Sequence, residues 1–235
     1  QMPSNDDKKV GLKFIRDFYR GTSAYADHVN TQFLSYIHLK TKLDDAVIAA
    51  TKDGKDIVLT GNPGDGKTHI IRVLKNQLEQ LNNIKIELDA STLSNEEIYS
   101  RWARAKETHT PFVIAINAAV LFSVYNSYSF FQPIREAYLQ MANAVVFHNE
   151  DSNSDSVVVF DLSKRDALSP EILKQAITKM TDDCHYVECA NCPLFNSCVV
   201  HKNRKLLNNE IFQERLSLIL QRVSLRGYHA TLREV

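Results

Sequence analysis

Runs of apolar residues along the chain predict four strands. Residues 57–60, 112–116 and 157–160 are apolar runs of strand length, and the unbroken run at 112–116 is typical of a buried central strand. Residues 84–88 alternate apolar and charged side chains, which indicates a strand at the edge of a sheet with one face in water.

Helical periodicity fills the intervals between these strands. Apolar residues recur on one face over 69–81, Ser94 followed by Glu97 starts a helix expected over about 95–106, and an aromatic-rich helical stretch covers 119–147. Strands that alternate with helices predict an α/β fold with a parallel sheet flanked by helices. The ligand crevice of such a fold lies at the carboxyl ends of the strands.

The pattern divides the chain into three parts. Residues 1–54 are a helical lead-in, 55–168 hold all four strands, and 169–235 contain no strand candidate. In the last part we expect one helix that starts at Pro170 and a long amphipathic helix over 208–224.

Composition narrows the class of protein without choosing a function. The 235 residues are 44% hydrophobic and 24% charged, so disordered, collagen-like and coiled-coil classes are excluded. Lys and Arg number 28, as do Asp and Glu, and the zero net charge removes any whole-chain argument for capture of nucleic acid or an anionic membrane. No apolar run reaches the roughly 20 residues of a membrane helix and no secretion signal opens the chain, so we expect a cytoplasmic protein without a membrane partner.

A glycine-rich loop that fits the Walker A pattern follows the first strand directly. Such a loop wraps backbone N–H groups around phosphate oxygens at a helix amino terminus, where the helix dipole adds positive character. Lys67 would reach the β- and γ-phosphates, and Thr68 would bind Mg²⁺ through its hydroxyl. A strand before the loop and an amphipathic helix after it are the context that this motif requires, so we expect ATP and Mg²⁺ as cofactors. The expected nucleotide-binding residues of the loop are Gly61, Asn62, Pro63, Gly64, Asp65, Gly66, Lys67, Thr68 and His69.

The loop and strands resemble those of AAA+ ATPases, in which a central apolar strand ends in an Asp-Glu pair. That resemblance puts Asn117 and Ala118 at the place of the pair, and Ala118 has no group that could polarise the attacking water. Asp89, at the end of the alternating strand, is the alternative acid. Three interpretations stay open: nucleotide binding without efficient turnover, a substitution at Ala118 that traps ATP, or a non-standard site that uses Asp89. The catalytic candidates are therefore Lys67, Asn117, Ala118 and Asp89.

Other polar residues follow the later elements. In the AAA+ interpretation Asp161 or Ser163 would sense the γ-phosphate, and an ordinary helix cap explains them equally well. Arg226 or Arg233 would reach the nucleotide as a sensor arginine, with solvated surface arginines as the alternative. AAA+-like domains usually complete their site with an arginine from a neighbouring copy, so ATP would promote homo-oligomers. The candidates for that arginine are Arg101, Arg104 and Arg165.

All four cysteines lie within fifteen residues, at Cys184, Cys189, Cys192 and Cys198. This spacing is typical of a tetrahedral Zn²⁺ site, with a [4Fe-4S] cluster as the alternative and four unliganded cysteines as a third explanation. His185 and His201 flank the thiols and are interpreted as surface or packing residues. The basic run at 201–205 is the best local candidate for DNA contact, which we expect to be weak in the isolated chain; a solvated helix start explains it as well.

Six segments of the chain, which include the glycine-rich loop and the cysteine group, together resemble the ATPase component, of the DptF type, of phosphorothioation-dependent restriction systems. The resemblance spans most of residues 55–235 and implies a prokaryotic defence ATPase that couples nucleotide state to protein partners acting on DNA. The competing hypothesis is a signalling or scaffold module with little turnover, which docks a protein partner through its cysteine module. The segments that carry the resemblance are 59–68, 88–91, 115–117, 161–163, the cysteine group and 231–234.

Overall fold

The structure is a computed structural model, and it describes residues 12, 34, 37–81, 83–147, 156–228, 230 and 231. The described chain divides into two compact units. One comprises residues 40–165 and Thr231, and the other comprises residues 166–228 and 230 with the described residues before Lys40.

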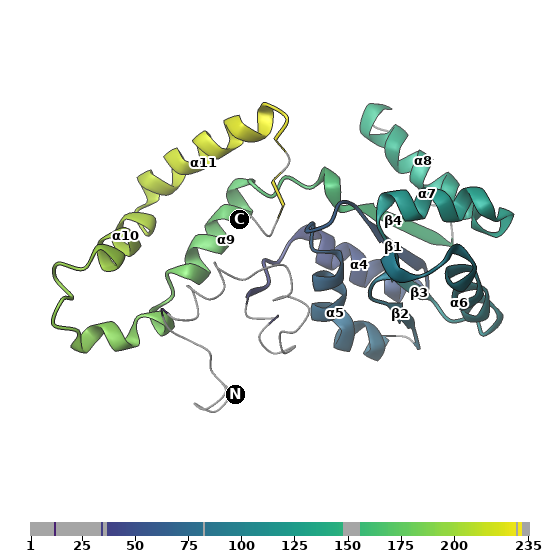
Figure 1. Cartoon of the computed structure of the whole chain (residues 1–235), viewed down its shortest axis with the longest axis horizontal. Helices are drawn as coiled ribbons and strands as arrows, with labels where there is room; N and C mark the ends of the chain where they lie inside the picture. The colour runs from purple at the N-terminus through teal and green to yellow at the C-terminus, as the bar shows by residue number, and fades with distance from the viewer. Residues whose placement is uncertain are drawn as a thin grey trace. The chain divides into compact units, whose positions relative to one another are not determined.

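Four parallel strands form the sheet of the first unit (Figure 1). In the order in which they pair, they are β2 (Lys85–Glu87), β3 (Phe112–Ala115), β1 (Asp56–Thr60) and β4 (Val157–Asp161). The predicted α/β fold with a parallel sheet flanked by helices is confirmed, with the run at 112–116 in the interior of the sheet and the alternating segment at 84–88 at its edge. Because all four strands are parallel, their carboxyl ends lie together at one end of the sheet.

Helices cover both faces of this sheet (Figure 1). Successive residues of β1 serve opposite faces, as the two-residue period of a strand requires. Ile57 and Leu59 pack with the helices of one face, and Val58 packs with those of the other. The first face carries α4 (Lys42–Lys52) and α5 (Lys67–Leu81), and the second carries α6 (Asn95–Glu107), α7 (Ala118–Ser127) and α8 (Gln132–Phe147).

A buried carboxylate joins α6 to the amino end of the sheet. Asp56 is fully buried; its Oδ2 accepts a hydrogen bond from Trp102 Nε1 at 2.8 Å and forms an ion pair with Lys106 Nζ at 2.7 Å. Its Oδ1 accepts from the backbone N–H of Phe112 at 2.9 Å. A buried charge is stable only with partners of this kind, so the network fixes α6, β1 and β3 relative to one another.

The aromatic-rich stretch predicted as helical over 119–147 is interrupted. Tyr128 has extended backbone, with φ of −137° and ψ of 127°, and separates α7 from a 3-10 turn at Ser129–Phe131 that leads into α8. The interruption lets Tyr99 of α6 stack on Tyr128 with ring centroids 4.8 Å apart, while Phe131 is fully buried. Packing of aromatic rings between helices favours a break that periodicity along one helix does not show.

The second unit is helical where it is described. Its α9 (Pro170–Met180) follows the N-cap Ser169, as predicted, and α10 (Val199–Leu207) and α11 (Glu210–Leu225) follow later in the chain. Short 3-10 turns at Asp183–His185 and Val187–Asn191 connect α9 to α10 through the cysteine-containing segment. Among the helices described in either unit, none is both long and apolar enough to span a membrane.

Arg204 of α10 holds the segment that follows α9. Its Nε donates to the carbonyl oxygen of Thr181 at 2.9 Å, and its guanidinium also pairs with Asp183. The guanidinium carbon lies 4.2 Å from the centre of the Tyr186 ring, a cation–π contact. The second unit therefore packs the start of the cysteine segment against α10.

Candidate functional site

The loop between β1 and α5 has a backbone geometry that depends on glycine. Gly61 follows the buried β1 with φ of 136°, in the region that L side chains rarely adopt. A Cβ at this position would lie 2.8 Å from Asp65 Oδ2 and 3.0 Å from the backbone nitrogen of Ser163. The buried Asp65 carboxylate accepts a 2.7 Å hydrogen bond from the backbone N–H of Asn62 and so closes the loop on itself.

Lys67 begins α5 and directs its ammonium group back into this loop. Its Nζ donates to the carbonyl oxygens of Gly61 at 2.9 Å and of Asn62 at 2.7 Å. The lysine predicted to reach phosphates is therefore held within the loop by neutral acceptors. A phosphate oxygen is a stronger acceptor for an ammonium group than a carbonyl oxygen, because both partners are then charged.

Three carboxylates act on Lys67. Burial lowers the pKa of its ammonium group, and the negative charges of Asp65, Asp89 and Asp161 act in the opposite direction. These residues come from the loop itself, from the end of β2 and from the end of β4. The structure thus brings together at the loop three acids that are far apart in the sequence.

Asp89, one of the two acids considered as a magnesium ligand, follows a residue that contacts Thr68. The Thr68 hydroxyl donates to the carbonyl oxygen of Leu88 at 3.1 Å. Asp89 is the next residue, and its side chain accepts from the backbone N–H of Ser91 at 2.9 Å, capping a 3-10 turn at Ala90–Thr92. Asp89 therefore follows directly on the residue that contacts Thr68, the expected magnesium ligand.

Asn117 and Ala118 lie at the same end of the sheet. Asn117 is the N-cap residue of α7 and makes no side-chain capping hydrogen bond, and Ala118 is the first residue of that helix. Because β3 lies between β2 and β1, Asn117 follows a strand that separates Asp89 from the loop. The assignment of Asn117 and Ala118 to the magnesium and water positions stays a prediction.

Asp161 and Ser163 form a cap at the end of β4. Asp161 Oδ1 accepts from the backbone N–H of Ser163 at 3.0 Å and from its hydroxyl at 2.6 Å, which starts the 3-10 turn Leu162–Lys164. The capping alternative thus describes what both residues do in this structure. Sensing of the γ-phosphate by either one stays a prediction.

Arg165 contacts the phosphate loop of its own chain. Its Nη2 donates to the carbonyl oxygen of Asp65 at 2.6 Å, and burial lowers the pKa of its guanidinium group. The role of Arg165 in the site of a neighbouring copy stays a prediction. Of the other two candidates, Arg101 pairs with Glu87 of β2, and Arg104 is exposed on α6.

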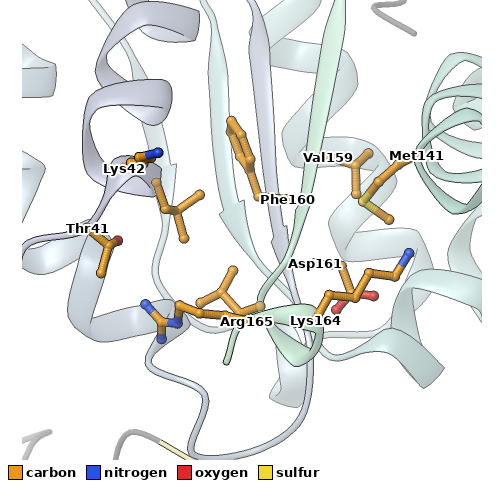
Figure 2. A pocket seen from close by; sticks show the side chains of 10 residues that line it. Thr41, Lys42, Met141, Val159, Phe160, Asp161, Lys164 and Arg165 are labelled. Carbon is orange, nitrogen blue, oxygen red and sulfur yellow. The ribbon is translucent and has the colours of Figure 1, made fainter. Parts of the chain in front are cut away.

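A cavity of about 420 Å³ adjoins the loop (Figure 2). Thr41 and Lys42, at the start of α4, bound it on one side in Figure 2, and Met141 of α8 lies on the other. Phe160 lies between them, and Arg165 lies at the end of the cavity in this view. Because Arg165 also donates a hydrogen bond to Asp65, it links the cavity wall to the phosphate loop.

The structure describes some, but not all, of the remaining residues that were predicted to bind nucleotide. A Cβ at Gly64 would lie 3.6 Å from the side chain of Thr231, so Thr231 lies beside the loop at this residue. Arg233 lies outside the described residues, and Arg226 is the C-cap of α11 in the second unit. His69 is in the first turn of α5.

The four cysteines of the second unit are half-buried and form no disulfide among the described residues. Within the described residues, no three or more His, Cys, Asp and Glu side chains are grouped so that they could hold a metal ion. The metal predicted at Cys184, Cys189, Cys192 and Cys198 therefore stays a prediction.

Sequence reasoning did not identify Arg165 as a partner of the loop, the carbonyl group of Leu88 as a partner of Thr68, or Thr41 as part of a cavity wall. No local pattern marks these contacts, because each joins segments at least 20 residues apart through the packing of the sheet. Comparison of the chain with protein-family models, with curated proteins and with solved structures found no match, so the site is interpreted from its own geometry.

Proposed function

We propose that this chain binds ATP with Mg²⁺ at residues 61–68 and acts as the nucleotide-dependent motor or switch of a prokaryotic DNA-restriction assembly. The observation that carries the nucleotide part is the position of Lys67: its ammonium group is held inside a glycine loop, at the junction of a buried strand and a helix. The restriction part rests on the sequence resemblance alone.

The charges around the loop support binding of a magnesium–nucleotide complex rather than of free ATP. Three carboxylates act on Lys67, and Arg165 adds a second cation beside them. A free triphosphate would be repelled by the carboxylates, whereas a divalent cation bridging them to the phosphates reverses that interaction. ATP binding should therefore depend strongly on Mg²⁺.

The contacts at the end of β2 support Asp89 as the acid for magnesium. Its neighbour Leu88 already contacts Thr68 through the backbone carbonyl, so Asp89 is adjacent in the chain to the residue that the Thr68 hydroxyl contacts. In this assignment Asn117 would offer its amide to the γ-phosphate or to the attacking water. It follows β3, the strand between β2 and β1. Ala118 would take no chemical role.

The cavity beside the loop supports a place for the nucleoside. Its volume of about 420 Å³ lies within the range of small-molecule sites, and Phe160 gives it an aromatic surface on which a base could stack. Thr41 supplies a polar group at its margin. The proposed ligand would thus extend from this cavity, past Arg165, into the phosphate loop.

Titration of the whole chain with ATP tests the nucleotide part. We expect Lys67→Ala to weaken Mg²⁺–ATP binding by at least about 100-fold, because a charge-assisted contact to phosphate is lost within a desolvated loop. Lys75→Ala is the matched control: this lysine lies on the same helix, is about half exposed and pairs with Glu79. Equal affinity in the Lys67 variant and the control would contradict the proposal, as would ATP binding that chelation of Mg²⁺ leaves unchanged.

A second function is favoured by one observation, the absence of a polar side chain at Ala118. In that case the protein is a switch that binds ATP with little turnover and docks a protein partner. Steady-state ATP hydrolysis with and without DNA distinguishes the two. Turnover that DNA or a partner raises supports the motor, and binding without turnover under every condition supports the switch.

A further inference from the structure

One histidine beside the cysteines has a buried nitrogen without a partner. Nδ1 of His201 is enclosed and makes no hydrogen bond to any residue that the structure describes. Its ring packs on Phe195, with ring centroids 4.1 Å apart, and Phe195 lies between Cys192 and Cys198 in the chain. The imidazole thus belongs to the cysteine segment rather than to a solvated surface, and a buried polar atom left unpaired requires an explanation.

The spacing around His201 makes two equivalent pairs of ligands. Cys189 and Cys192 are separated by two residues, and the backbone N–H of Cys192 donates to the carbonyl oxygen of Cys189 at 3.1 Å in a tight turn. Cys198 and His201 are also separated by two residues: Cys198 is the N-cap of α10 and His201 lies in its first turn. Residues three apart at a helix start lie on one side of it, so each pair can bind one metal ion from two positions.

Cys184 has a different environment. Its backbone N–H donates to Asp182 Oδ1 at 2.9 Å within the 3-10 turn Asp183–His185. Cys184 therefore belongs to a turn that is separate from the turn Val187–Asn191, which holds Cys189.

We propose that Cys189, Cys192, Cys198 and His201 bind one Zn²⁺ ion, and that Cys184 is not a ligand. A set of three thiolates and one imidazole is a common structural zinc set, whereas a [4Fe-4S] cluster is held by four thiolates, so this assignment also chooses the metal. In the described residues the four side chains are not yet grouped around one point. The segment between α9 and α10 consists of short turns, and zinc would draw its two ligand pairs together as it binds.

The experiment measures zinc and iron in the full chain, purified without oxygen, for the wild type and two variants. We expect one zinc and no iron per chain in the wild type and in Cys184→Ser. We expect His201→Ala to bind zinc more than about 100-fold more weakly in competition with a chelator, because losing a ligand costs more than the 10–100-fold that loss of a supporting contact costs.

A third variant keeps the test decisive if His201→Ala does not fold. His201→Cys restores four ligands and should keep one zinc, and the absorption of the Co²⁺-substituted protein should gain thiolate character relative to the wild type. The Co²⁺ spectrum of Cys184→Ser should match that of the wild type. Loss of zinc in Cys184→Ser with retention in His201→Ala would overturn the ligand set, and iron in place of zinc, or no metal in the wild type, would overturn the site. None of these measurements depends on nucleotide binding, so the two proposals stand or fall separately.

Discussion

The guanidinium group of Arg165 donates a 2.6 Å hydrogen bond to the carbonyl oxygen of Asp65, 100 residues earlier in the chain. Arg165 follows the turn after β4, and Asp65 lies in the middle of the phosphate loop. The negative charges of Asp44 and Asp65 both act on the half-buried guanidinium. This contact ties the strand at one edge of the sheet, and the cavity beside it, to the loop proposed to bind phosphate.

Arg165→Ala should weaken ATP binding by roughly tenfold. The variant removes a charge-assisted hydrogen bond, worth about 1.5–3 kcal/mol, from a loop that must be ordered before phosphate binds. Arg165→Lys should have an ATP affinity between those of Arg165→Ala and the wild type, since lysine keeps the charge but lacks the planar guanidinium group. Calorimetric titration provides the measurement. Arg222→Ala, at an exposed position of α11, is the control and should bind ATP normally.

Gly61→Ala should abolish detectable ATP binding while leaving most of the fold intact. The backbone φ of 136° is strained for alanine, and the added Cβ would lie only 2.8 Å from Asp65 Oδ2. Gly54→Ala is the matched control: its φ is also positive, at 70°, but a Cβ there has no described atom within 4 Å. The control should cost about 1 kcal/mol of stability and should not change ATP affinity. If both variants bind ATP equally well, the observed loop conformation is not the binding conformation.

Asp89→Asn should reduce the Mg²⁺ dependence of ATP binding and lower any turnover. Asparagine keeps an oxygen that can accept the hydrogen bond from the Ser91 backbone, so the turn after β2 should survive the change. What is lost is the negative charge next to Thr68, which a hard divalent cation requires. Titration of Mg²⁺ at fixed ATP measures the effect, with Asp53→Asn at the exposed end of α4 as the control. If the Mg²⁺ concentration at half-maximal ATP binding is unchanged, Asp89 does not bind the metal and Asn117 becomes the candidate.

Asp56→Ala should destabilise the first unit by about 2–6 kcal/mol, because it leaves the buried donors of Trp102 and Phe112 without an acceptor at about 1–3 kcal/mol each. Denaturant unfolding monitored by tryptophan fluorescence suits this test, since Trp102 is the only tryptophan of the chain. Trp102→Phe, which removes one donor and keeps the carboxylate, should cost less; because this variant lacks the tryptophan, its unfolding is followed by circular dichroism, as is that of the wild type for comparison. A loss below 0.5 kcal/mol in Asp56→Ala, about the effect of an ordinary surface substitution, would show that the network does not stabilise the fold.

The sequence by itself determined the order of elements, because hydrophobic periodicity reports which face of each segment must be buried. The strands at 56–60 and 112–115 and the helices that follow the loop and Ser94 all agree with the predicted ranges to within a few residues. The loop at 61–68 was equally visible, since its glycines, lysine and threonine are consecutive. The break at Tyr128 was not visible, because it depends on rings contributed by α6.

Which residues surround the loop was decided only by the tertiary structure. Asp89 and Asn117 were both chemically suitable at the sequence level, and in the structure it is Leu88, the residue before Asp89, that contacts Thr68. The sequence marked Arg165 only as one of three candidates for serving a neighbouring copy, and the pairing of β4 with β1 brings it to Asp65 of its own chain. Strand order and register depend on contacts between segments far apart in the chain, and a local pattern of apolar and polar residues specifies that a segment is buried but not what it is buried against.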